Sequence, residues 1–254
     1  MSRVALVTGA ARGIGAATVR LLLDEGWSVV ALDRAGDDER LPYAMGTAAG
    51  LEALGATVVV GDATDETVLR AAVALAEDRY GGLDAALAVA GVVAGGVPLW
   101  EQPAPEVRAV LEVDLHAPIA LARAAVPALL RRPAPRSGRF LVVASTAATR
   151  GLPMLAAYCA AKAGVTGLVR ALAVELGPAG ITANSVSPGS TDTEVLAESA
   201  RLYGLPDAGS FAAQQPIGRL LHVDEVARAL VWLAGPDTGA ITGVDLPVDG
   251  GLAL

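Results

Sequence analysis

The chain has 254 residues, 53% of them hydrophobic, and a formal net charge of −8. This acidity argues against nucleic acid and against an anionic membrane surface as partners, because like charges repel. A single cysteine, Cys159, excludes an internal disulfide and a cysteine-based zinc site, and the two histidines, His116 and His222, are too separated to form a metal centre. We therefore expect no metal site, and we interpret Cys159 as a small buried apolar residue.

The N-terminal sequence enters an apolar strand directly after Arg3, without the features of a secretion signal. No apolar run reaches the roughly 18 residues of a membrane span without a glycine, a proline or a charge. We therefore expect a cytoplasmic protein that has no membrane partner.

Short β-branched runs alternate along the chain with helical stretches rich in alanine and leucine, which is typical of a parallel sheet covered on both faces. The predicted strands are 4–7, 28–32, 57–60, 85–89, 139–143, 182–187 and 245–248. The predicted helices are 14–25, 66–80, 105–130, 155–176 and 223–233. Neither a shift in composition nor an internal repeat marks a boundary, so residues 1–254 are expected to form a single α/β domain.

Three segments interrupt this alternation. Segment 34–50 follows the second strand, and its apolar residues Pro42, Tyr43 and Met45 favour a functional insertion on the cofactor side over a solvated surface insertion. Segment 131–138 is a proline-rich surface connection. Segment 190–216 follows the sixth strand and mixes polar turns with apolar residues, which predicts a lid over a substrate.

The first strand is followed at once by TGAARGIG, in which Gly9, Gly13 and Gly15 lead into the first helix. Glycines at these positions permit a tight turn and a close approach of the backbone, and the helix N-terminus offers free N–H groups to a pyrophosphate. The position of the motif between a strand and a helix makes a dinucleotide site the favoured interpretation.

Asp33 ends the second strand, where a carboxylate accepts hydrogen bonds from an adenosine ribose and repels a 2′-phosphate. Its alternative role is that of a turn aspartate. Arg34 follows and is able to serve a phosphate, so NAD is favoured over NADP without NADP being excluded. Asp62 is a candidate partner of the adenine amino group, and equally a cap for the helix that begins near Glu66.

Lys162 is the only lysine among 19 lysine and arginine residues, and it stands four residues after Tyr158 in the run YCAAK. Residues four apart share one face of a helix, so the ammonium and the phenol act on one region. A nearby cation favours the phenolate and lowers the tyrosine pKa from about 10. This pair therefore predicts an oxygen base; the alternative is a surface lysine after a core tyrosine.

Taken together, the chain resembles the short-chain dehydrogenase/reductase family over essentially its whole length. The TGAARGIG turn, Ser145, YCAAK and the later SPG at 187–189 match that family's motifs in order and spacing. The resemblance implies a Rossmann-type, doubly wound, seven-stranded parallel sheet and hydride transfer between a nicotinamide and an alcohol or ketone.

The resemblance also assigns roles to residues. Tyr158 is implied as the acid/base, Ser145 as a hydrogen-bond donor to the substrate oxygen, and Lys162 as a ligand of the nicotinamide ribose. The candidate catalytic residues are Ser145, Tyr158, Lys162 and Asp114. The candidate cofactor residues are Gly9, Arg12, Gly13, Ile14, Gly15, Asp33, Arg34, Asp62, Ala63, Ala90, Gly91, Tyr158, Lys162, Pro188, Gly189 and Thr191.

Two departures from the family pattern stand out. The family's NNAG after the fourth strand is AVAG here, at 88–91, so the asparagine contacts are lost and only the backbone geometry can remain. The family's helix asparagine is replaced by Asp114, which keeps acceptor oxygens and loses the amide donor. Asp114 is a candidate catalytic residue, or alternatively a buried polar residue that bends the helix.

A narrower resemblance is to dehydrogenases associated with the mycofactocin redox system. It rests on the segment DRAGDDERLPYAMGTAAGLEAL at 33–54 and on DLHAP, RSGRF and LAAYCAAK. It implies that a loop closes over NAD, that NAD stays bound, and that mycofactocin is the electron acceptor. The wider family resemblance implies a homotetramer built on the helices 105–130 and 155–176.

Trp100, Leu152, Met154, Leu196 and Tyr203 are candidate linings of an apolar pocket, and no basic cluster is evident for a substrate carboxylate or phosphate. We expect a hydrophobic or alicyclic secondary alcohol or ketone as substrate. One alternative is an NADPH-dependent ketoreductase of carrier-protein thioesters, which Asp33 and the negative charge disfavour. The other is a non-catalytic NAD-binding sensor, which the intact Ser145, Tyr158 and Lys162 disfavour.

Overall fold

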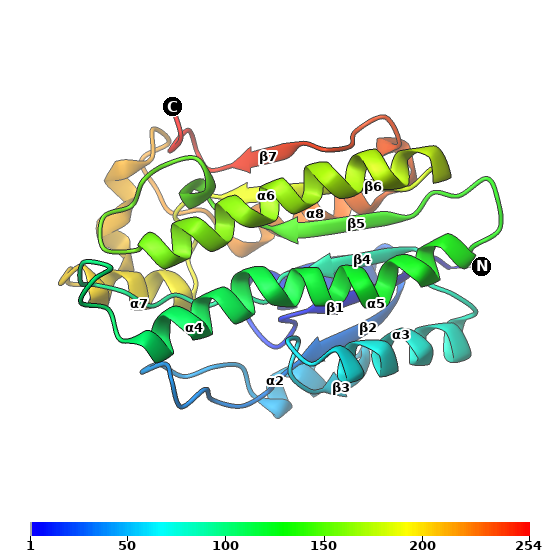
Figure 1. The fold of residues 1–254 in the computed structure, drawn as a ribbon, viewed down its shortest axis with the longest axis horizontal. Helices are drawn as coiled ribbons and strands as arrows, with labels where there is room; N and C mark the ends of the chain where they lie inside the picture. Colours follow the sequence, from blue (N-terminus) through cyan, green and yellow to red (C-terminus); the bar gives the residue numbers. More distant parts are fainter. Residues whose placement is uncertain (1) are drawn as a thin grey trace.

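The computed structural model describes residues 2–254 and contains a sheet of seven parallel strands in the order β3-β2-β1-β4-β5-β6-β7 (Figure 1). The chain crosses from one half of the sheet to the other between β3 and β4. This is the predicted doubly wound, Rossmann-like α/β fold. The strands are β1 (Val4–Thr8), β2 (Ser28–Asp33), β3 (Thr57–Val60), β4 (Ala85–Ala88), β5 (Arg139–Val143), β6 (Thr182–Pro188) and β7 (Asp245–Val248).

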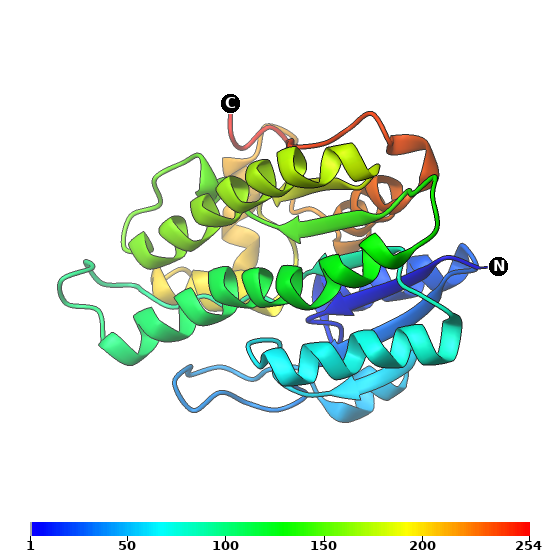
Figure 2. The ribbon, with the colours of Figure 1, turned by 45° about the vertical axis from the view of Figure 1, so that its right-hand side comes forward.

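Helices cover both faces of the sheet (Figures 1 and 2). Because side chains alternate along a strand, Val4 and Leu6 of β1 join one core and Ala5 and Val7 join the other. The first core is closed by α3 (Glu66–Tyr80), α5 (Ala117–Arg131) and α6 (Ala156–Leu176). The second core is closed by α1 (Gly13–Asp24) and α8 (Val223–Ala234).

The predicted strands are all present, and their ends differ from the predicted ones by at most one residue. Four of the predicted helices are equally close. Two short helices were not predicted, α2 (Ala48–Glu52) and α7 (Glu194–Leu202), and both begin at a threonine cap. Thr47 accepts from the Gly50 N–H, and Thr193 accepts from the Leu196 N–H.

The prediction of one continuous α-helix over 105–130 is wrong in its middle. The structure has α4 (Ala104–Leu111), a π-helical turn η1 (Glu112–His116) and then α5. Pro118 has no N–H to donate to the carbonyl of Asp114 four residues earlier, so a regular α-helical bond is missing here. The wider turn carries Asp114, which is 1% exposed, into the protein interior.

Short 3₁₀ turns complete the fold: η2 (Thr146–Ala148), η3 (Gly177–Ala179), η4 (Ala208–Gln214) and η5 (Pro236–Thr238). Two helical stretches, Ala104–Arg131 and Ala156–Ala179, are long and apolar enough to cross a membrane by length and composition. Each stretch contains proline, glycine or charged residues, so neither is an uninterrupted apolar run of the kind sought in the sequence. In the fold, side chains from both stretches, such as Leu121 and Val165, pack in the core beside the sheet.

Candidate active site

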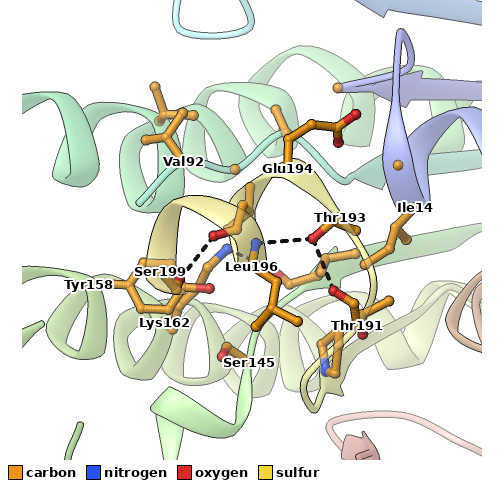
Figure 3. Close-up of a pocket in the computed structure, with 18 of the residues that line it drawn as sticks. Ile14, Val92, Ser145, Tyr158, Lys162, Thr191, Thr193, Glu194, Leu196 and Ser199 are labelled. Carbon is orange, nitrogen blue, oxygen red and sulfur yellow. Dashed lines mark hydrogen bonds between the residues drawn. The ribbon is translucent and has the colours of Figure 1, made fainter. Parts of the chain in front are cut away.

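One cavity of about 650 Å³ lies where the strands end, between the glycine turn after β1 and the segment that contains α7 (Figure 3). In Figure 1 the strand arrows point toward this side of the molecule. Every candidate cofactor residue named from the sequence lines this cavity, as do Ser145, Tyr158 and Lys162. Asp114 lies behind the cavity wall and not on it.

The glycine turn packs closely against neighbouring backbone because its residues lack side chains. Gly9 has a φ of +69°, and a Cβ there would lie 2.5 Å from the Ala90 backbone. A Cβ on Gly15 would lie 1.9 Å from the carbonyl oxygen of Gly9. Arg12 precedes α1 without a side-chain hydrogen bond to its first turn. The free N–H groups of that turn therefore fit a pyrophosphate.

Asp33 is fixed at the end of β2 by the backbone around it. One carboxylate oxygen accepts from the Ala11 N–H at 2.9 Å, and the other accepts from the Ala35 N–H at 2.8 Å. The carboxylate lines the cavity in this orientation, beside Arg34. Its position fits an adenosine ribose.

Arg34 is already paired. Its guanidinium donates to Asp38 at 2.8 Å, and the Asp38 side chain is only 6% exposed. Arg40 donates to the same carboxylate and also reaches Glu112 of η1. The hydrogen bonds from Arg40, with a smaller contribution from Arg34, hold the pKa of Asp38 well below its usual range. Arg34 is therefore not a free cation at the adenosine end of the cavity.

Asp62 does not cap α3, so the alternative role considered for it is wrong. The cap is Asp65, whose side chain accepts from the Thr67 N–H. Asp62 instead accepts from the backbone N–H and the hydroxyl of Thr64, both at 2.8 Å, and it lines the cavity next to Ala63. It remains a candidate partner for the adenine.

The insertion 34–50 lies against the cavity and does not extend into solvent. It is the blue segment that runs beside α4 in Figures 1 and 2. Tyr43 accepts a hydrogen bond from the Val93 N–H at 2.9 Å, and Arg12 donates to the Ala44 carbonyl at 2.6 Å. Leu41 is buried in an apolar cluster with Val92 and residues of α4. These contacts join the insertion to both edges of the cavity, and Met45 and Gly46 form part of its wall.

Ser145, Tyr158 and Lys162 converge from two parts of the chain, helix α6 and the segment that follows β5 (Figure 3). Tyr158 and Lys162 lie on α6, with the Lys162 ammonium 5.6 Å from the centre of the tyrosine ring. Ser145 precedes η2, where its hydroxyl accepts from the Ala147 N–H. The Lys162 ammonium donates to the Val143 carbonyl at 3.0 Å, which ties it to the end of β5.

The expected lowering of the Tyr158 pKa is outweighed in this structure. Burial raises the pKa of the phenol most, and Asp114 raises it further. Lys162 and the hydrogen bond with Ser145 lower the pKa, but the net direction is upward from the ordinary value. The Lys162 ammonium thus lowers the Tyr158 pKa as expected. Burial and Asp114, which the YCAAK motif does not reveal, raise this pKa by more.

Besides burial, Asp114 is the main charged group that opposes Lys162 at the phenol. Its Oδ1 lies 3.0 Å from the Lys162 ammonium and accepts from the Val92 N–H at 3.3 Å. Its Oδ2 is buried without a hydrogen-bond partner among residues 2–254. Burial raises the pKa of Asp114 although Lys162 counteracts it. Burial lowers the pKa of Lys162, but Asp114 and then Tyr158 reverse this, and the pKa ends above its ordinary value.

The substrate side of the cavity differs in part from the sequence prediction. Leu152, Leu196 and Tyr203 line it, together with Leu205 and Phe211 of the predicted lid. Trp100 and Met154 do not line it. Trp100 is 84% exposed and Met154 is 37% exposed, so apolar character alone was a poor guide to pocket residues.

Other wall residues were missed or misjudged. Arg150, Ser199 and Gln214 line the cavity without having been singled out, and each falls near a motif or within the predicted lid. Arg150 follows Ser145 by five residues, and Ser199 and Gln214 lie within segment 190–216. The sequence gives no other indication that these residues line the cavity. Cys159 is partly exposed, not buried, and its thiol lies 3.8 Å from the Arg150 carbonyl.

Known proteins resemble the chain over nearly all of its length. A family model described as enoyl-(acyl carrier protein) reductase matches residues 9–253. Cis-4-hydroxycyclohexanecarboxylate dehydrogenase of Sinomonas cyclohexanicum is 40% identical, covering 98% of this chain and 96% of its own. Trans-4-hydroxycyclohexanecarboxylate dehydrogenase of the same organism is 34% identical, covering 98% and 92%.

Among solved structures, carveol dehydrogenase from Mycobacterium avium in complex with NAD has a TM-score of 0.91 and 30% identity, with 98% of this chain and 97% of that chain covered. The fold, the length of the match and the shared motifs agree. The chain belongs to the classical short-chain dehydrogenase/reductase family and is an oxidoreductase of alcohol or ketone substrates.

Proposed function

We propose that the protein interconverts an alicyclic secondary alcohol and its ketone, with NAD as the hydride carrier and Tyr158 as the acid/base. The observation that carries this proposal is the convergence of Ser145, Tyr158 and Lys162 on the cavity that also contains the glycine cradle. The ring structure of the substrate is supported by the relatives named for hydroxycyclohexanecarboxylates and by the apolar wall of the substrate side.

When bound, NAD supplies the hydride acceptor and a positively charged ring beside the phenol. Ser145 donates a hydrogen bond that holds the substrate oxygen, and Tyr158 removes its proton in the oxidation direction or returns it in the reduction direction. Positioned acid/base catalysis of this kind contributes about 10²–10⁴ in rate. Lys162, fixed by Val143 and Asp114, keeps a positive charge next to the phenol throughout.

NAD is proposed over NADP because of two carboxylates at the adenosine end. Asp33 lines the cavity, and backbone N–H groups fix its carboxylate oxygens. Asp38 forms an ion pair with the guanidinium of Arg34. A 2′-phosphate would meet the negative charge of Asp33 and find no free cation in Arg34. The NAD bound in the carveol dehydrogenase structure and the NAD-dependent relatives in Mycobacterium tuberculosis agree with this choice.

We also propose that NAD stays bound between turnovers and that mycofactocin accepts the electrons. The insertion 34–50 supports this, because Met45 and Gly46 line the cavity and contacts with Arg12, Val93 and Glu112 hold the insertion in place. The resemblance of this segment to those of mycofactocin-associated dehydrogenases supports the identity of the acceptor.

The direct test is to purify the protein without added cofactor, dialyse it, denature it and identify the released nucleotide. Bound NAD in near-stoichiometric amount supports retention. An empty protein that turns over NADPH with a β-ketoacyl thioester would instead establish the ketoreductase alternative. Nucleotide binding without oxidation of any alcohol would favour the sensor alternative.

We further propose a cytoplasmic homotetramer built on α5 and α6. Exposed apolar side chains on these helices, namely Ile119, Leu130 and Val174, are available to such a contact. Light scattering on the purified protein measures the assembly, and a monomer at micromolar concentration would contradict it.

A further inference from the structure

The substrate side of the cavity contains one cation without a carboxylate partner, in a wall of apolar and uncharged polar side chains. Arg150 lines the cavity together with leucine and aromatic side chains. Lys162, the other cation on this side, is neutralised by Asp114. The Glu194 carboxylate, which also lines the cavity, lies at the glycine turn, 4.0 Å from the position of a Cβ on Gly13. Within residues 2–254 no carboxylate forms an ion pair with Arg150.

Two hydrogen bonds position Arg150, one from its backbone and one from its side chain. Its backbone N–H donates to the Thr146 carbonyl at 2.9 Å, which holds it just after the η2 turn and five residues beyond Ser145. Its guanidinium donates to the Leu252 carbonyl. Leu252 belongs to a C-terminal turn in which Asp249 accepts from the Gly251 and Ala253 N–H groups.

The bond to Leu252 uses only part of the donor capacity of the side chain. A guanidinium has five N–H donors in a planar fork, and a carboxylate fits this fork with two parallel hydrogen bonds. Arg150 is exposed, so water screens such a pair, and we expect it to select the orientation of the substrate more than to add much affinity. A substrate carboxylate would thus meet both the charge and the geometry that Arg150 offers.

We infer that Arg150 binds a carboxylate carried by the substrate, on a part of the ring away from the reacting alcohol. The sequence shows no basic cluster for such a charge, and this inference needs only the one guanidinium of Arg150. It rests on the proposed function, because it names the class of alcohol as a hydroxylated alicyclic acid. Ser145 and Tyr158 hold the reacting oxygen, and Arg150 sets which end of the ring faces them.

The test compares two substrates within each variant. The acid is trans-4-hydroxycyclohexanecarboxylate, or its cis isomer, and the matched neutral substrate is the corresponding carboxamide. We expect the wild-type kcat/KM to favour the acid by about 2- to 5-fold, the range of a solvent-exposed ion pair. In Arg150→Met this ratio falls to near one, mainly through the KM of the acid, and Arg150→Lys recovers part of it.

The acid-to-amide ratio cancels any loss that both substrates share, such as a disturbance of Ser145. Arg136→Met is the matched control, because it removes one cation from a side chain that donates to the Leu130 carbonyl and does not line the cavity. We expect the wild-type ratio in this control. An equal fall in Arg136→Met and Arg150→Met would assign the effect to net charge and overturn the inference.

A binding measurement separates failure of this inference from failure of the proposed function. Cyclohexanecarboxylate and cyclohexanecarboxamide carry no alcohol, so calorimetric titration of the nucleotide-loaded protein reports recognition without turnover. Tighter binding of the carboxylate in the wild type, reduced in Arg150→Met and partly restored in Arg150→Lys, supports the site even where no alcohol is oxidised. Equal affinity of the wild type for the acid and the amide overturns it.

Discussion

The Lys162 ammonium lies 3.0 Å from a carboxylate oxygen of Asp114, and both side chains are at most 4% exposed. The cation that acts on the catalytic phenol is therefore half of a buried ion pair. The charge of Asp114 offsets that of Lys162, and we therefore expect Asp114 to influence the pH at which the Tyr158 phenol loses its proton.

Asp114→Asn should shift the pH profile of alcohol oxidation to lower pH. The amide keeps an acceptor for the Val92 N–H and for Lys162, but it removes the negative charge that raises the pKa of Tyr158. An effective dielectric constant near 20 predicts a shift of about 1–2 pH units. The measurement is the rate of nicotinamide reduction against pH.

The two profiles should also converge at low pH. Burial raises the pKa of Asp114, so the wild-type carboxyl becomes protonated as the pH falls and then carries no more charge than the amide. Lys162, Tyr158 and the Tyr43 hydroxyl are the groups that interact with this carboxyl in the structure. Parallel profiles with the same apparent pKa would exclude this role for Asp114.

Lys162→Arg should reduce turnover by about 100-fold or more, because a planar fork cannot replace a point charge held between two oxygens. The ammonium donates to Val143 and pairs with Asp114, each at 3.0 Å. Arg170→Lys is the reverse exchange on the same helix and should be neutral. Steady-state kinetics with thermal unfolding of each variant distinguish lost catalysis from lost folding.

Asp38→Asn should release Arg34 and weaken the attachment of the insertion 34–50. We expect faster loss of NAD on dialysis and about a tenfold fall in the preference for NAD over NADP, because a freed guanidinium can bind a 2′-phosphate. The pKa of Asp38 is lower in the folded protein than the ordinary aspartate value of about 4. Its ion pairs with Arg34 and Arg40 therefore contribute their full stability above about pH 4, and this contribution is lost only in stronger acid. Retention by the wild type should therefore not change between neutral and mildly acidic pH on account of this carboxylate.

The control for that experiment is Asp78→Asn, on the exposed side of α3, which changes net charge by the same amount. Unchanged retention and cofactor preference in Asp38→Asn would show that the ion cluster does not control the adenosine end.

Gly15→Ala should abolish nucleotide retention, because its Cβ would lie 1.9 Å from the Gly9 carbonyl and the turn would have to move. The displaced turn should also cost about 1–3 kcal/mol of unfolding free energy. Gly167→Ala on α6, where a Cβ meets nothing within 4 Å, should be neutral or slightly stabilising. Chemical denaturation and analysis of the released nucleotide report both effects.

The sequence alone predicted the sheet and most of the cavity because these depend on local patterns. Strand runs, the glycine turn and the YCAAK spacing each determine a position on an element, and parallel topology brings the strand ends together. The Asp114–Lys162 contact was not predictable in this way, because it joins two helices through a π-helical turn.

The sequence also does not predict which side chains pair with one another around the cavity. Nothing in the spacing of segment 34–50 indicates that Asp38 would hold both Arg34 and Arg40. The apolar character of Trp100 predicts a pocket residue, yet its side chain is largely exposed and does not line the cavity. Such contacts depend on tertiary packing, which hydrophobic periodicity does not encode.

We propose that Tyr158 moves the proton while NAD takes the hydride. The most direct measurement is the absorbance of reduced nicotinamide after wild type and Tyr158→Phe, both loaded with NAD, are mixed with an alicyclic alcohol. We predict reduction in the wild type and a loss of about 10²-fold or more in Tyr158→Phe, with nucleotide still bound. Reduction at a near-normal rate in Tyr158→Phe would contradict the account.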